Sequence, residues 1–283
     1  MIGVAEQPRA TPVTSAASPT PKITLAGVGM TYATRQGLVE ALRDVNLTVP
    51  PGEFMCIVGP SGCGKSSLLR ILAGITTQSA GEIAIARGAD GQRSLHAIVF
   101  QEYTLFPWRT LLDNIAFGLE MRGVARKERL AIARDYLGKV GLTRFADAYP
   151  HQLSGGMKQR AAIARVLAND PEILLMDEPF GALDAQTRHV LQEELLRIWE
   201  AERKTVVYIT HSIEEAVMLG DRIVLMTERP GHIKSIYPVA LSGPRTLNLR
   251  TTVAFNQLVQ AIWEDLVTEV NKARAQEWGE QDD

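Results

Sequence analysis

The sequence predicts an α/β fold with a mainly parallel sheet. The apolar runs Phe54–Val58, 173–176 and 206–210 are short and continuous, which is typical of strands buried on both faces. The amphipathic segment 186–203 separates the last two runs, giving the strand-helix-strand order from which parallel sheets are built. We therefore expect parallel strands with helices packed against the sheet.

Composition places the chain among ordinary globular proteins and argues against several kinds of partner. Its 283 residues are 46% hydrophobic and 22% charged, which suits one large domain or two small ones. The formal net charge of -2 leaves no basic surplus for a phosphate backbone, so no nucleic acid partner is expected. Cys56 and Cys63 have the spacing of neither a disulfide framework nor a metal site, which favours a reducing cytoplasm.

The amino-acid composition changes sharply after residue 22. Residues 1–22 are dominated by Ala, Pro, Thr and Ser, so we expect a disordered leader. Strands are expected at 23–32 and 44–49, and the turn at Pro50, Pro51 and Gly52 leads from the second into the buried run that begins at Phe54.

Helices and strands alternate through the middle of the chain. A helix is expected over Lys65–Leu72, and strand character returns at 81–86 and 97–100. A mostly helical insertion follows over about 107–169, and Arg222–Met226 adds a later strand.

The C-terminal segment 253–278 has the spacing of an amphipathic packing helix. Its large apolar residues recur at helical intervals: Phe255, Leu258, Ile262, Trp263, Leu266 and Val270. No run in the sequence reaches the roughly 18 consecutive apolar residues that a membrane helix needs, and the N-terminus lacks the order of a signal peptide. Any membrane role is therefore expected to be peripheral.

A phosphate-binding loop follows the buried strand at Phe54. The pattern G-x-x-x-x-G-K-[ST] is matched by Gly59, Pro60, Ser61, Gly62, Cys63, Gly64, Lys65 and Ser66. Glycines let backbone N–H groups and a helix N-terminus converge on an anion, Lys65 adds positive charge, and Ser66 offers a hydroxyl to Mg²⁺. Cys63 lies among these groups, so alkylation of its thiol is expected to block hydrolysis, with bound ATP protecting it.

Two carboxylates and a histidine follow other predicted strands. Asp177 and Glu178 come directly after the run 173–176, at the sheet edge where open α/β folds bind ligands. Asp177 is placed to hold Mg²⁺, and Glu178 to orient or deprotonate the attacking water. His211 follows the run 206–210 and could contact the γ-phosphate or that water.

A second anion site is indicated by the segment Leu153-Ser154-Gly155-Gly156-Met157-Lys158-Gln159-Arg160. Ser154, Gly155 and Gly156 open a helix whose unsatisfied N–H groups and positive dipole end favour an anion. A chain with a single phosphate-binding loop has no evident need for two such sites.

This segment closely resembles the signature motif of the ABC ATPases, and the resemblance covers about residues 23–239. It implies a P-loop NTPase core at 23–240 with an antiparallel β subdomain and a helical subdomain insertion, followed by a helical extension at 241–283. It also implies roles for further residues. Tyr32 matches the adenine-stacking aromatic, Gln101 the glutamine loop with metal and catalytic roles, Asp184 the dimer-contact loop and His211 the switch histidine. Ser67, at the end of the nucleotide-binding loop, stands where the family usually has threonine.

The same resemblance implies a head-to-tail dimer in which the signature of one subunit caps the phosphate bound to the P-loop of the other. ATP and Mg²⁺ are the implied ligands. A polytopic membrane permease is the implied partner, with a solute-binding protein acting indirectly, and the chain is expected at the cytoplasmic face of the inner membrane.

Three segments resemble the nitrate, sulfonate and taurine uptake branch of ABC importers: 99–108, 178–184 and 228–233. Transport of such a small anion is therefore expected. Import of another small solute, or a soluble ABC ATPase acting outside transport, remains the alternative. The apolar cluster formed by Tyr103, Leu105, Phe106 and Trp108 is either a groove for a permease helix or interior packing.

The substitution Lys65→Ala tests the phosphate-binding loop. Removal of the ammonium group should greatly reduce nucleotide affinity, because that group supplies the side-chain positive charge for the β- and γ-phosphates. Equilibrium binding of a fluorescent ATP analogue to wild type and variant measures the effect, and unchanged affinity would contradict the assignment.

Overall fold

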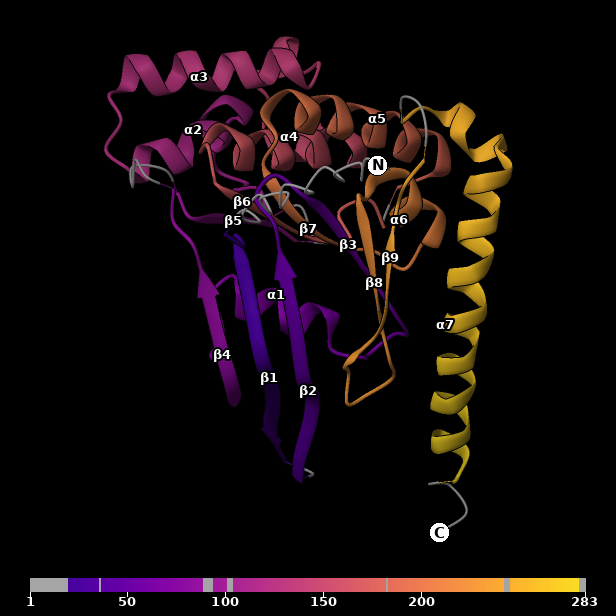
Figure 1. The fold of residues 1–283 in the computed structure, drawn as a ribbon. Helices are drawn as coiled ribbons and strands as arrows, with labels where there is room; N and C mark the ends of the chain where they lie inside the picture. Colours follow the sequence, from indigo (N-terminus) through magenta and orange to yellow (C-terminus); the bar gives the residue numbers. More distant parts are fainter. Residues whose placement is uncertain are drawn as a thin grey trace, which may run out of the picture.

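The computed structural model describes residues 20–35, 37–88, 94–100, 104–181, 183–241 and 245–279. Most of the expected leader, residues 1–19, therefore lies outside the described residues. Within them the chain forms two sheets with helices between and around them (Figure 1). No helix in these ranges is both long and apolar enough to span a bilayer.

The main sheet has the strand order β5-β6-β7-β3-β8-β9. Its first five strands run parallel, and β9 is antiparallel to β8. These strands are β3 (Phe54–Val58), β5 (His96–Val99), β6 (Ile173–Asp177), β7 (Thr205–Ile209), β8 (Arg222–Met226) and β9 (Ile233–Pro238). Strands β3 and β7 are buried at every position, which explains their unbroken apolar sequence.

A second, antiparallel sheet has the order β2-β1-β4. It consists of β1 (Ile23–Thr34), β2 (Gly37–Val49) and β4 (Ala80–Ile85). Helix α1 (Lys65–Leu72) lies between the two sheets, because Leu68, Leu69 and Leu72 share one apolar cluster with β1, β2, β3 and β7. This packing fixes the phosphate-binding loop against both sheets.

The expected helical insertion is present, and its helices form a layer above the main sheet (Figure 1). It comprises α2 (Leu111–Met121), α3 (Arg126–Lys139), two 3₁₀ turns at Thr143–Phe145 and Pro150–Gln152, and α4 (Gly155–Ala168). Helices α5 (Ala185–Glu202) and α6 (Ile213–Leu219) join the same apolar core as α4.

The C-terminal part forms a 3₁₀ turn at Leu247–Thr251 and the long helix α7 (Val253–Gly279), which runs beside β8 and β9 (Figure 1). Strand β9 was not expected from the sequence. Its Ser235 and Tyr237 hydroxyls donate to the Asp265 carboxylate of α7, and the Lys234 ammonium lies 3.0 Å from the carboxylate of Glu269. These polar contacts hold α7 against β9.

The expectation that Trp263 is a packing residue is wrong. Ile262 is completely buried, whereas Trp263 is 53% exposed. The apolar face of α7 follows Phe255, Leu258, Ile262 and Leu266, and a residue directly after Ile262 is turned about 100° from this face.

Replacing Ile262 with alanine should destabilise the fold by about 2–5 kcal/mol, because a fully buried side chain leaves a cavity. The adjacent change Trp263→Ala is the matched control and should have a clearly smaller effect, since that side chain is half in solvent. Chemical unfolding followed by circular dichroism measures both, and the reverse order of effects would contradict the position of α7.

Candidate nucleotide site

The phosphate-binding loop turns tightly from β3 into α1. Gly62 and Gly64 have φ angles of 76° and 101°, in the left-handed region that glycine adopts readily. A Cβ atom on Gly64 would also lie 2.6 Å from the carbonyl oxygen of Ala41. Glycine at position 64 therefore satisfies both the backbone geometry and the close approach of β2.

The Lys65 side chain folds back onto this loop. Its buried ammonium group donates to the carbonyl oxygens of Gly59 at 2.9 Å and Pro60 at 2.7 Å. These contacts hold a positive charge beside the N-terminus of α1, whose first N–H groups already favour an anion.

A hollow of about 350 Å³ opens at this loop. Its lining contains half of the expected nucleotide-binding residues together with Glu178: Tyr32, Val39, Ala41, Ser61, Gly62, Gly64, Lys65, Ser66, Ser67, Glu178 and Arg229. The Tyr32 hydroxyl donates to Ser67 Oγ at 3.1 Å, so the aromatic ring lies at the phosphate loop. The serine that departs from the usual threonine keeps this hydroxyl contact.

Ser66 and Asp177 bring two oxygen ligands together. The Ser66 hydroxyl donates to the Asp177 carboxylate at 3.1 Å, which joins α1 to the end of β6. Burial raises the pKa of Asp177, while the hydrogen bond from Ser66 opposes that rise. A hydroxyl and one carboxylate beside a phosphate site form a donor set that suits Mg²⁺, which prefers oxygen ligands and keeps substrate phosphates in its shell.

Glu178 sits in a strained backbone conformation at the carboxyl end of β6. Its φ of 44° is unusual for a residue other than glycine, and such strain is concentrated at functional sites. The Glu178 carboxylate lies 3.2 Å from Nδ1 of His211, which follows β7. The structure therefore brings these two candidate site residues together at the carboxyl edge of the main sheet.

The signature residues occupy another part of the surface. Ser154 is the N-cap of α4 and accepts a hydrogen bond from the Met157 N–H at 3.3 Å. Asp184 caps α5 in the same way, accepting from the Thr187 N–H at 2.9 Å. Among the described residues, the lining of the P-loop hollow includes neither Ser154, Gly155, Gly156 nor Asp184.

Gln101, expected to have metal and catalytic roles, lies outside the described residues, as does Tyr103.

Arg229 also lines the hollow, although the sequence patterns did not indicate it as a site residue. Its loop contacts the P-loop closely, because a Cβ on Gly231 would lie 1.9 Å from the carbonyl oxygen of Cys63. The sequence signal for this residue is the R-P-G pattern at 229–231, which lies within a segment that resembles the importer branch.

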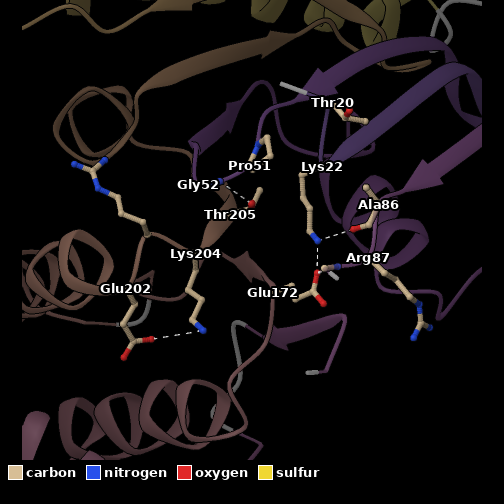
Figure 2. Close-up of a pocket in the computed structure, with 12 residues that line it drawn as sticks. Thr20, Lys22, Pro51, Gly52, Ala86, Arg87, Glu172, Glu202, Lys204 and Thr205 are labelled. Atoms are coloured by element: carbon tan, nitrogen blue, oxygen red, sulfur yellow. Dashed lines mark hydrogen bonds and ion pairs between the residues drawn. The ribbon is translucent and has the colours of Figure 1, made fainter. Parts of the chain in front are cut away.

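A second hollow, of about 540 Å³, lies at the opposite edge of the main sheet, where strands β3, β6 and β7 begin (Figure 2). Its buried lysines are paired within the protein. Lys22 binds the Glu172 carboxylate, and Lys204 pairs with Asp170 and Glu202. Because these charges are already compensated, we regard this hollow as structural.

Comparison with known proteins agrees with this geometry. Residues 42–181 match the family model described as ABC transporter. The chain is 52% identical over 236 residues to an uncharacterised ABC transporter ATP-binding protein of Methanocaldococcus jannaschii, covering 83% of this chain and 87% of the relative.

Two further relatives have names that state a transported solute. A nitrate import ATP-binding protein of Synechocystis sp. is 47% identical, with 75% of this chain and 80% of the relative covered. An aliphatic sulfonates import ATP-binding protein of Bacillus thuringiensis is 42% identical, with 83% of this chain and 92% of the relative covered.

A solved structure has a similar fold. It is an ATP-binding cassette in a dimeric state, bound to ADP and Pi, with 35% identity and a TM-score of 0.68, covering 78% of this chain and all of that one.

Alkylation of Cys63 should be slow at neutral pH and faster as the pH rises. The side chain is only 1% exposed, and burial raises the pKa of its thiol although Lys65 opposes this shift. The reactive thiolate is therefore scarce near pH 7. Mass spectrometry after maleimide treatment at several pH values measures the rate, with buried Cys56 as the internal control.

Loss of ATPase activity should follow modification of Cys63, and bound ATP should slow both. A Cys63→Ala variant should be insensitive to the reagent. Full activity after confirmed modification of Cys63 would contradict the placement of this thiol at the phosphate loop.

Proposed function

The chain belongs to the family of ABC transporter ATP-binding proteins, and we propose that two copies of it bind and hydrolyse two ATP molecules between them to drive a membrane permease. The observation that carries this proposal is the separation of the two anion sites: the P-loop hollow lacks Ser154, Gly155 and Gly156 among its described lining residues. In a head-to-tail dimer, the signature segment of one subunit would complete the hollow of the other.

The roles of the residues follow from their positions. Backbone N–H groups of the P-loop and the Lys65 ammonium bind the phosphates, and Tyr32 stacks on the adenine. Ser66 and Asp177 would hold Mg²⁺, with Gln101 as a further ligand, and the ion neutralises phosphate charge when bound.

Glu178 and His211 act on the water side of the phosphate. The Glu178 carboxylate accepts a proton from the attacking water, and His211, 3.2 Å away, fixes that carboxylate and contacts the γ-phosphate. Asp184, at the start of α5, lies in the dimer-contact loop.

The permease contact is proposed at the junction of the main sheet and the helical insertion. Trp108 is 71% exposed here and packs on Phe106, with ring centroids 5.6 Å apart. Exposed aromatic residues of this kind suit the apolar face of a partner helix. Phe106 is half-buried and also contacts Phe117, whereas the exposure of Trp108 supports the docking alternative at that residue.

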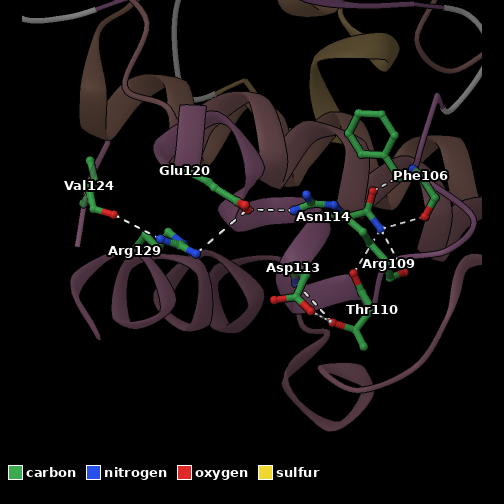
Figure 3. A network of polar contacts seen from close by, with 8 residues as sticks. All are labelled: Phe106, Arg109, Thr110, Asp113, Asn114, Glu120, Val124 and Arg129. Atoms are coloured by element: carbon green, nitrogen blue, oxygen red, sulfur yellow. Dashed lines mark hydrogen bonds and ion pairs between the residues drawn. The ribbon is translucent and has the colours of Figure 1, made fainter. Parts of the chain in front are cut away.

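A polar network holds this surface in place (Figure 3). The buried Asn114 amide accepts from the Phe106 N–H at 2.7 Å and donates to the Phe106 carbonyl at 3.1 Å. Arg109 binds the Glu120 carboxylate at 2.7 Å. The segment that carries Trp108 is therefore fixed to α2 by both backbone and side-chain contacts.

The transported solute is proposed to be a small anion such as nitrate, a sulfonate or taurine. Similarity to nitrate and sulfonate import ATP-binding proteins supports this class. A separate solute-binding protein would deliver the anion to the permease. The chain itself would act at the cytoplasmic face of the inner membrane as a peripheral subunit.

Affinity purification of the detergent-extracted, tagged chain from its host tests the transport assignment. We expect a polytopic membrane protein to co-elute with the ATPase activity. Recovery of full ATPase activity with soluble partners alone would favour a non-transport ABC ATPase instead.

The substitution Glu178→Gln should abolish ATP turnover while leaving ATP binding intact, because it removes the proton acceptor but keeps the shape of the side chain. The variant should accumulate as an ATP-bound dimer on size exclusion. Glu202→Gln, at the opposite edge of the sheet, is the control and should hydrolyse ATP normally. A Glu178→Gln protein that remained monomeric and active would contradict the mechanism.

A further inference from the structure

A buried acidic side chain lies behind the switch histidine and has no part in the mechanism above. Glu215 of α6 is only 5% exposed. The preceding residue, Glu214, differs in its surroundings, because its side chain is 60% exposed. Burial of a carboxylate is unfavourable unless hydrogen bonds compensate it, so the contacts of Glu215 are informative.

Both carboxylate oxygens of Glu215 accept hydrogen bonds from buried side chains. The Gln192 amide of α5 donates to Oε1 at 2.8 Å, and the Thr210 hydroxyl donates to Oε2. The amide oxygen of Gln192 faces the Arg250 guanidinium at 3.4 Å. This second contact fixes which way the Gln192 amide points.

Thr210 immediately precedes His211, and Ser212 follows it. The hydrogen bonds of Glu215 extend to both of these residues. The Thr210 hydroxyl accepts from the Ser212 N–H at 3.0 Å. The Ser212 hydroxyl in turn accepts from the Glu215 N–H at 3.2 Å. The two residues that flank His211, Thr210 and Ser212, are therefore both hydrogen-bonded to Glu215.

The network lies in the buried interior. Tyr208 and Cys56 are completely buried beside it, and burial together with the Glu215 charge raises the pKa of both groups, so they remain neutral. A hydrogen bond in such a medium is stronger than in water, and its loss is correspondingly harmful.

We propose that Glu215 is a positioning residue for ATP hydrolysis: through Thr210 and Ser212 it holds the His211 turn so that the imidazole meets the Glu178 carboxylate. The proposal rests on the function proposed above. The network anchors the turn to α5 through Gln192, and α5 is the helix that begins at the dimer-contact residue Asp184. Glu215 thus joins the dimer-contact helix to the hydrolytic side of the site.

The direct test compares Glu215→Gln with the control Glu214→Gln. In the first variant a glutamine amide faces either Thr210 or the fixed Gln192 amide, so one of the two hydrogen bonds is lost. We expect kcat to fall about 10- to 100-fold, the range produced by small misplacements of a catalytic group, with the KM for ATP unchanged. Glu214→Gln should retain wild-type kcat.

A second pair of variants keeps the test decisive if Glu215→Gln folds poorly. Thr210→Ser retains the hydroxyl and should keep most of kcat, whereas Thr210→Val should lower it by a factor similar to that of Glu215→Gln. The double variant should be no slower than the slower single variant, because both changes disrupt the same network that holds the His211 turn.

Two measurements distinguish the positioning role of Glu215 from the proposed ATPase function. In a His211→Ala background, single-turnover hydrolysis should be unaffected by Glu215→Gln. Equal loss in both backgrounds, or wild-type kcat in folded Glu215→Gln and Thr210→Val, would overturn the positioning role. Absence of ATPase activity in the wild-type protein would instead contradict the proposed function.

Discussion

The parallel arrangement of β6, β7 and β3 is the constraint on which the site depends. Parallel strands end at one edge of a sheet, so residues far apart in sequence emerge there together. Gly59 follows β3, Glu178 follows β6 and His211 follows β7, and these strands are adjacent in the sheet. The buried apolar strands therefore determine both the stability of the core and the positions of the phosphate-binding loop, the carboxylates and the histidine.

The loop between β3 and α1, together with Tyr32 and β2 of the second sheet, forms one side of the proposed nucleotide site. Ser154 stands outside this hollow, at the start of α4. The start of α4 favours an anion but contributes none of the described lining residues of the hollow, which supports the proposed composite site between two subunits. The Thr210, Glu215 and Gln192 contacts give a direct route by which the helix after Asp184 reaches the hydrolytic residues.

Sequence patterns predicted the helices and strands that have regular apolar spacing and a clear loop or turn before them. Lys65–Leu72 and Arg222–Met226 are observed as expected, because their apolar spacing and the preceding glycine loop or turn leave little freedom. Strand β9 was missed because Lys234 and Ser235 serve contacts with α7 and interrupt its apolar pattern. Arg229 was missed because the phosphate-binding loop that it faces is distant in sequence. Glu215 was missed because its burial and its contact with Gln192 of α5 arise only when α5 and α6 pack together.

The composite site is tested most directly by cross-linking between differently tagged copies, one carrying Ser61→Cys in the P-loop and the other Ser154→Cys in the signature. A short bis-maleimide reagent should join the two copies in the presence of ATP, and each copy alone should give little product. Intermolecular cross-linking that ATP increases is the result that the account predicts. No cross-linked dimer in the mixture, or a cross-link formed within a single chain that carries both cysteines, would contradict it.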